Sequence, residues 1–208
     1  RGGSGSRPAT GGGSAAPTGG ANGDAGPSGS PGTDAGVDCP PVSVSQAPEA
    51  LSCAGLYADI ATKDLAHDVQ AFDPAYRLWS DGAEKLRWIY LPKGTQIDSS
   101  DPDSWKFPVG TKLFKEFAWK GHRVETRMFW KSAENRWLKA AYHWNADETE
   151  ALRFGGGEVD VAGDKYYIPS AKECDQCHKG RVDRALGFEQ ILLSLPGATG
   201  LTLQKLID

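Results

Sequence analysis

Lys112-Leu113-Phe114-Lys115-Glu116-Phe117-Ala118-Trp119 is the stretch that decides the fold. Successive side chains of a strand point to opposite faces, so this stretch predicts a β-strand with two different faces. The turn pair Lys120-Gly121 follows, and a second alternating stretch covers 122–131. A third stretch of this kind covers 137–144. The sequence therefore predicts an antiparallel meander with one face in the core and the other in water.

Other segments extend or cover this sheet. Residues 86–91 carry a large side chain at nearly every position, so we expect a strand that is covered on both faces. Residues 39–76 combine prolines with possible short helical turns at 48–51 and 54–61, which we interpret as a strap over the sheet. Residues 166–168 predict a last short strand.

The C-terminal part carries helical spacing, and the N-terminal part carries none. Apolar residues recur at helical intervals over 183–195 and again over 202–208. Residues 1–37 consist almost wholly of Gly, Ala, Ser, Pro and Thr, a composition that predicts a disordered tether. We therefore divide the chain into this tether and a β-sheet domain over 38–208. The first residue, Arg1, is not methionine and the last helical pattern ends abruptly, so we expect a processed polypeptide that continues beyond Asp208.

Cys174-Asp175-Gln176-Cys177-His178 carries the most specific chemistry in the chain. This C-x-x-C-H spacing is typical of a c-type haem attachment site. Two thiols bond to the two haem vinyl groups, and the adjacent imidazole becomes the proximal ligand of the iron. The sequence therefore predicts covalent haem c held by Cys174, Cys177 and His178.

Two other chemistries could use the same cysteines. A C-x-x-C pair can form half of a zinc site, but Cys39 and Cys53 are too widely spaced to supply the other half. A dithiol redox pair would be expected in a βαβ context, which the strand pattern does not indicate. Both alternatives stay open beside the haem interpretation.

Composition and cysteine use suggest an exported protein. Haem c is attached outside the bacterial cytoplasmic membrane, where Cys39 and Cys53 can pair in a disulfide rather than remain buried free thiols. The formal charge of −4 over 208 residues, without a basic run, argues against nucleic acid as a partner. No apolar run is long enough to cross a bilayer, so membrane contact would come only through a lipid anchor on the tether.

Several separate stretches together resemble a family of poorly characterised haem-c proteins from Gram-negative bacteria, described as mono- or dihaem cytochromes. The resemblance covers the chain from about residue 51 to its end, and the matching stretches are 76–85, 88–95, 107–117, 125–127, 142–151 and 169–178. It implies an exported cytochrome of the periplasm or cell surface. The composition of the tether suits either a lipid-anchored surface protein or a linker between domains. This chain holds one C-x-x-C-H, so a second haem would lie beyond Asp208.

A more distant resemblance, through 108–116 and the late C-x-x-C-H, is to the small β-sheet cytochromes c of the cytochrome c′-beta type. It implies a mainly β fold, in which a curved antiparallel sheet with short helices holds haem against one face through a C-terminal segment. In the lysine-crosslinked relatives of that group a strand lysine bonds the haem, and Lys115 resembles a candidate for this position.

The distal side of the iron has four candidate side chains: Met128, Lys115, His143 and His67. Met128 points inward by alternation and would raise the potential as a thioether ligand, although a methionine often simply fills a core. Lys115 lies among aromatic residues, where desolvation favours its neutral amine. We expect Lys115 near an open or weakly ligated iron, with Met128 ligation as the equal alternative.

Three functions follow from these alternatives. Electron transfer with a redox partner protein is the first, and a haem enzyme or small-ligand binder with an open iron site is the second. A cell-surface or sugar-binding module is the third, since the chain has seven tryptophans and six tyrosines. Alternation, however, places Trp88, Trp119, Trp130 and Trp144 on inward faces, which favours core packing. The sequence specifies neither an enzymatic reaction nor an oligomeric state.

Overall fold

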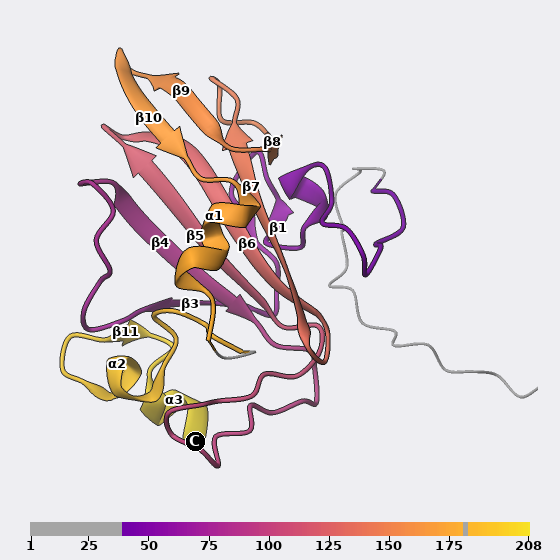
Figure 1. Cartoon of the computed structure of the whole chain (residues 1–208), viewed down its shortest axis with the longest axis vertical. Helices are drawn as coiled ribbons and strands as arrows, with labels where there is room; N and C mark the ends of the chain where they lie inside the picture. Colours follow the sequence, from indigo (N-terminus) through magenta and orange to yellow (C-terminus); the bar gives the residue numbers. More distant parts are fainter. Residues whose placement is uncertain (1–38, 181–182) are drawn as a thin grey trace, which may run out of the picture.

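A seven-stranded antiparallel sheet dominates the structure, a computed structural model that describes residues 39–180 and 183–208 (Figure 1). Its strand order is β11-β3-β4-β5-β6-β7-β8, and it does not close into a barrel. The predicted mainly β, antiparallel fold is confirmed, whereas the predicted tether at 1–37 lies outside the described residues. The strands of this sheet are β3 (Val69–Asp73), β4 (Glu84–Tyr90), β5 (Lys112–Trp119), β6 (His122–Ala133), β7 (Arg136–Trp144), β8 (Ala151–Phe154) and β11 (Thr199–Gly200).

The β5–β6 hairpin is the centre of the sheet. Lys120 and Gly121 both have positive φ, as a two-residue hairpin turn requires. The pairing then shifts by one residue, because Ala118 faces Arg123 whereas Phe117 faces Glu125. This β-bulge sets the register of the rest of the hairpin, in which Phe114 faces Met128 and Lys115 faces Arg127.

The strap covers one face of the sheet, as predicted. It contains the 3-10 helix η1 (Leu51–Cys53) and the small antiparallel pair β1 (Tyr57–Asp59) and β2 (Asp64–Leu65). The helical turns expected at 48–51 and 54–61 are therefore wrong apart from η1. The reason is tertiary packing, because Tyr57 joins a buried core with Trp88, Met128 and Trp144 from the sheet.

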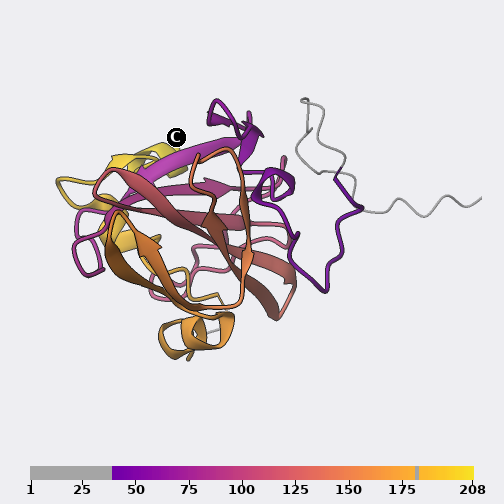
Figure 2. The same ribbon diagram turned by 90° about the horizontal axis from the view of Figure 1, so that it is seen from above.

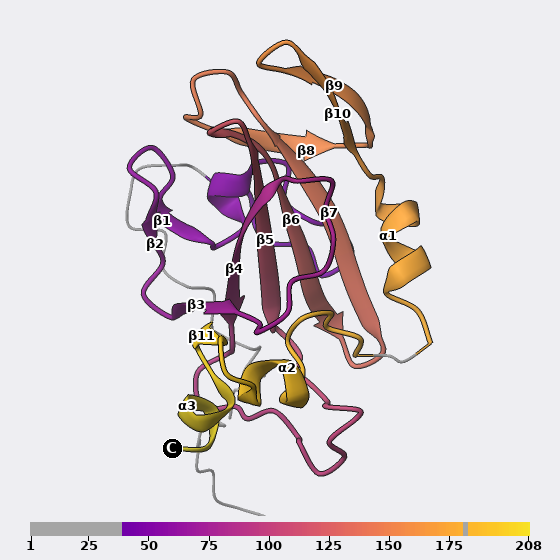
Figure 3. The same cartoon turned by 90° about the vertical axis from the view of Figure 1, so that its left-hand side faces the viewer.

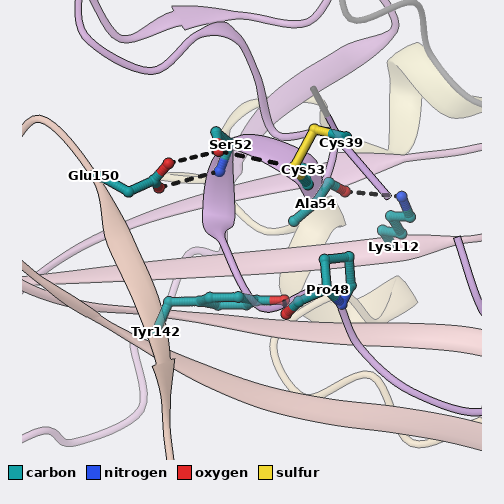
Figure 4. The surroundings of a disulfide bond; sticks show 8 residues. All are labelled: Cys39, Pro48, Ser52, Cys53, Ala54, Lys112, Tyr142 and Glu150. Atoms are coloured by element: carbon teal, nitrogen blue, oxygen red, sulfur yellow. Dashed lines mark hydrogen bonds between the residues drawn. A yellow bond between two sulfur atoms is a disulfide. The ribbon is translucent and has the colours of Figure 1, made fainter. Parts of the chain in front are cut away.

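The Cys39–Cys53 disulfide is present, as predicted, and it closes the start of the strap (Figure 4). Hydrogen bonds near the disulfide fix the strap to the sheet. Ser52 donates to Glu150, Tyr142 donates from its hydroxyl to the Pro48 carbonyl at 3.1 Å, and Lys112 donates from Nζ to the Ala54 carbonyl at 2.8 Å. The strap therefore covers this side of the sheet with a buried core.

The opposite face is covered in two separate places, above and below its middle. The hairpin of β9 (Gly157–Val161) and β10 (Asp164–Ile168) packs over the upper part, and the C-terminal helices pack below (Figure 1). In the view from above, this hairpin lies in front of the sheet (Figure 2). The predicted wet face is therefore wrong: Glu125 and Lys131 on this face are 0% and 1% exposed. Their charges are compensated by ion pairs with Arg127 and Asp183.

The C-terminal helices are shorter than predicted. The helix expected over 183–195 is only α2 (Gln190–Ser194), whereas α3 (Leu203–Ile207) matches its prediction closely. Gly187 has a φ of +90°, which interrupts a right-handed helix, and Phe188 packs edge-on against Phe72 with ring centroids 4.8 Å apart. Aromatic packing against the sheet thus overrides the local helical pattern.

Lys112 generates a prediction about stability and pH. Its side chain is buried over the Trp130 ring, and burial lowers the pKa of its ammonium group to about 8. Below pH 8 the folded and unfolded states both hold the proton, so the cost of burying the charge, about 3 kcal/mol, is complete. Above pH 8 the folded state releases this proton while the unfolded state still holds it. The free energy of unfolding therefore rises with pH until the unfolded state also releases the proton, near the ordinary pKa of 10.5.

We expect Lys112→Met to remove this rise. The free energy of unfolding of both proteins is measured with urea from pH 7 to 9.5. Above pH 8 the value of the variant should fall relative to that of the wild type by up to about 1.4 kcal/mol per pH unit. The range stops there because burial raises the pKa of Tyr57 and Tyr142, which lowers stability near pH 10. The exposed Lys106→Met is the control, and a Lys112→Met curve parallel to the wild type would contradict the prediction.

Candidate cofactor site

The C-x-x-C-H motif lies on a short capped helix, α1 (Ala171–Cys177), which packs beside β7 on the sheet face opposite the strap (Figure 3). Ser170 and Glu173 form a capping box, in which each side chain accepts a hydrogen bond from the other residue's backbone N–H. Cys174 and Cys177 are three residues apart on this helix, so they lie on one side of it. Both are free thiols, the first half-buried and the second exposed. The local sequence alone thus presents two adjacent thiols.

The imidazole of His178 is oriented by a single backbone group. Its Nδ1 lies 2.9 Å from the Arg184 carbonyl oxygen, which can only accept, so Nδ1 carries the proton and Nε2 keeps its lone pair. The ring packs against Phe129 with centroids 4.6 Å apart. Burial lowers the pKa of His178, which favours the neutral imidazole. His178 is therefore prepared to act as a metal ligand through Nε2.

A cavity of about 1120 Å³ opens between α1, the middle of the sheet and the β9–β10 hairpin. Sites for small molecules usually measure about 300–1000 Å³, so this one has room for a large planar group. Apolar and aromatic side chains form much of its wall. Among the lining residues are Phe72, Leu78, Trp79, Leu113, Phe117, Trp119, Phe129, Tyr166, Tyr167, Cys174, Cys177 and His178.

Positive charge is concentrated on the floor of this cavity. Arg87 from β4, Lys115 from β5 and Arg127 from β6 all line it. Arg87 donates to Asp73 at 2.6 Å and Arg127 donates to Glu125 at 2.8 Å. Burial, with Arg87 and Arg127 as further causes, lowers the pKa of Lys115 to about 8. The cavity thus suits a group that is apolar in its body and anionic at its edge.

The segment that follows the motif is fixed to the sheet by Asp183. Its carboxylate accepts from Lys131 Nζ at 2.7 Å, from Trp137 Nε1 at 2.7 Å and from the Phe107 N–H at 2.8 Å. The Asp183 and Lys131 side chains are 6% and 1% exposed. Because Arg184 is the next residue, these bonds also determine where its carbonyl meets His178.

The structure separates the two favoured distal candidates. Both residues belong to the lining of the cavity, but Met128 packs in the strap core and is only 1% exposed, whereas Lys115 is half-buried on the face that carries Arg87 and Arg127. The β-bulge causes this separation. If the pairing continued without a shift from the Trp119–His122 pair, Lys115 would lie opposite Thr126, and Met128 would share the sheet face of Lys115. The extra residue exchanges the two faces, since a shift of one residue inverts every side chain of a strand.

The histidine candidates lie away from the cavity. His143 has its Nδ1 2.9 Å from the Val124 carbonyl and packs against Phe154. The His67 side chain is 98% exposed and contacts Asp68. Neither histidine lines the cavity that contains Cys174, Cys177 and His178.

The structure also bears on the zinc, dithiol and sugar-binding alternatives. Within 39–180 and 183–208 there is no group of three or more His, Cys, Asp and Glu that could hold a metal ion, so the zinc alternative lacks further ligands there. The sheet that carries α1 is antiparallel, unlike the context of a thioredoxin-type pair. Trp88, Trp130 and Trp144 are buried in the strap core, so they offer no sugar-stacking platform, whereas Trp119 and the exposed Trp79 line the cavity. No helix in the described part of the chain is long and apolar enough to span a membrane.

Sequence reasoning missed Arg87, Arg127 and Asp183. Arg127 could have been found only from the bulged β5–β6 register, and Arg87 only from the β4–β5 register, which contains no bulge. Asp183 was assigned to a helix, and its three donors come from residues 46 to 76 positions away in the chain.

Comparison with protein-family models, curated proteins and solved structures finds no match to this chain. The geometry of the site must therefore carry the functional assignment. Two free thiols, an imidazole with a free Nε2 and a large cavity with a cationic floor fit a haem group that is attached covalently.

The Asp183–Lys131 pair generates a prediction. Asp183→Ala would leave the Lys131 ammonium buried without its charge partner, which typically costs about 3–5 kcal/mol. The measurement is urea unfolding of the full chain. Lys131→Met added to Asp183→Ala should recover part of this loss, because the unpaired charge is then gone. A loss below about 1 kcal/mol for Asp183→Ala, or no recovery in the double variant, would contradict the role of this pair.

Proposed function

We propose that this protein is a c-type cytochrome that binds one haem covalently and transfers electrons. The observation that supports this best is the position of the whole C-x-x-C-H motif on the wall of a cavity of about 1120 Å³. Cys174 and Cys177 would form the thioether bonds, and His178 would bind the iron through Nε2. The haem supplies one-electron chemistry when it is bound.

The residues of the chain perform three tasks in this proposal. The Arg184 carbonyl holds His178 Nδ1–H and so orients the ring, a contact that also increases the basicity of Nε2. Phe117, Phe129 and Tyr166 limit the access of water to the cavity. Lys115, which has no acidic partner within the described residues, places positive charge beside it, and this favours the reduced form because reduction adds an electron.

The compartment and partner belong to the same proposal. Haem c is attached outside the bacterial cytoplasmic membrane, and the Cys39–Cys53 disulfide is stable in such oxidising surroundings. We therefore propose an exported protein of the periplasm or cell surface, tethered through 1–37, that exchanges electrons with a redox protein.

One observation favours a second candidate function, the binding or conversion of a small ligand at the iron. Met128 is packed with Phe114 and Ala140 on the strap side of the sheet, so a thioether bond to iron would require the core to open. Lys115 and Met128 both belong to the residues that line the cavity, but Met128 is only 1% exposed there. An iron without a strong second axial ligand is open to exogenous ligands.

The first prediction of this proposal concerns covalent attachment. After expression with a haem-c maturation system, the intact mass should equal that of the polypeptide plus one haem, and acid–acetone extraction should leave the colour in the protein. Cys174→Ser with Cys177→Ser should release it, whereas Cys39→Ser with Cys53→Ser should retain it. Free haem in the organic layer from the wild type would contradict the proposal.

The second prediction separates the two candidate functions. Met128→Leu conserves volume in the core, so we expect the optical and electron paramagnetic resonance spectra of the haem to remain those of the wild type. If Met128→Leu instead converts a low-spin iron to high-spin, Met128 is the distal ligand and the open site is excluded. His178→Ala serves as the positive control and should change the optical and electron paramagnetic resonance spectra in either case.

A further inference from the structure

Three cations form a row across the floor of the cavity. Arg87 lies directly opposite Lys115 in the β4–β5 ladder, and Lys115 lies directly opposite Arg127 in the β5–β6 ladder. Directly opposed side chains share one face of the sheet, and like charges in such positions are destabilising. The row therefore needs negative charge to offset it.

The two arginines have acidic partners, and the lysine between them has none within the described residues. Arg87 pairs with Asp73 and Arg127 pairs with Glu125. Lys85, diagonal to Lys115 on β4, also lines the cavity, and in the part of the chain that the structure describes its ammonium group donates to the Leu78 carbonyl and to no carboxylate. Asp73 and Glu125 are thus used by the arginines. Asp81 and Glu173, which also line the cavity, accept hydrogen bonds from Trp79 and from Ser170 and Tyr167 respectively.

The surroundings of Lys115 do not suit an unpaired cation. The lysine is half-buried in the cavity wall, and Arg87, Arg127 and Lys85 face it from the neighbouring strands, with the Cys174 thiol on α1 nearby. Burial and these cations together lower its pKa. An anion bound between Lys115 and the arginines would relieve the repulsion and would accept charge-assisted hydrogen bonds.

We propose that Lys115, with Arg87 and Arg127 on either side, forms a carboxylate-binding site in the floor of the cavity. In the haem-loaded protein the occupant is a propionate carboxylate of the haem. This assignment of the source rests on the proposed function, whereas the carboxylate site itself does not. The other source of the same chemistry is a small free carboxylate that enters the cavity.

The first arm of the test measures the midpoint potential of the haem-loaded full chain against pH. Intact mass confirms haem attachment beforehand, so a failure of the proposed function is recognised separately. In the wild type Lys115 holds the pKa of the propionate low. In Lys115→Met the pKa of the propionate should rise, because a neighbouring opposite charge typically lowers the pKa of a carboxyl group by about 1–3 pH units. The pH at which the midpoint potential begins to fall should therefore rise by about one unit or more.

Two variants control this arm. Lys115→Arg keeps the positive charge and should retain the wild-type profile. Lys165→Met removes an exposed cation that also lines the cavity but already contacts Glu158 and Asp160, and it should likewise leave the profile in place.

The second arm titrates the protein with acetate, followed by the optical spectrum of the haem or, in a chain without haem, by tryptophan fluorescence. If Lys115→Met leaves the pH profile unchanged but weakens acetate binding about tenfold or more, the site takes a free carboxylate. If neither the profile nor acetate binding changes, Lys115 forms no carboxylate site and the proposal is overturned. In a chain that carries no haem the acetate arm alone decides, and unchanged acetate binding overturns the proposal.

Discussion

The buried carboxylate of Asp183 is the constraint on which the site depends. It joins three donors from separate parts of the chain, the Lys131 ammonium, the Trp137 indole and the Phe107 N–H, and so fixes the segment after α1 against the sheet. The next carbonyl, that of Arg184, then meets His178 Nδ1. A buried ion pair contributes little net stability because desolvation offsets its attraction, but its geometry is demanding. We infer that this pair determines the position of the segment more than it adds to stability.

The two faces of the sheet are packed differently. The strap face is closed by the disulfide, by hydrogen bonds to the sheet and by an aromatic core in which Met128 is one member. The opposite face is packed above and below but leaves a cavity at its middle, with α1 beside β7 (Figure 3). The packed strap core and the disulfide thus support the cavity floor from behind. The cations of the floor are thereby displayed on three adjacent strands.

The sequence predicted the elements that depend on local patterns. Strands β5, β6 and β7, the disulfide and the helix α3 follow from alternation, compartment and helical spacing, and the structure agrees with each. The exchange of faces between Lys115 and Met128 could not be predicted, because one bulged residue in β6 decides it and no local signal marks that residue. The failure of the helix over 183–189 has a similar cause: Asp183 and Phe188 make contacts with the sheet that a local pattern does not contain. Contacts between distant parts of the chain therefore determine the details of the site.

The central claim is that the cavity holds a haem attached through Cys174 and Cys177, with His178 oriented toward its iron. The most direct measurement is the reduced optical spectrum of the purified, matured chain in alkaline pyridine, where the position of the α band reports whether the vinyl groups have been converted to thioethers. Pyridine replaces the axial ligands, so this band depends on the porphyrin substituents and not on the distal side. Our account predicts the band of a haem with both vinyl groups consumed. The band of unmodified haem, or the absence of any haem band, would contradict it.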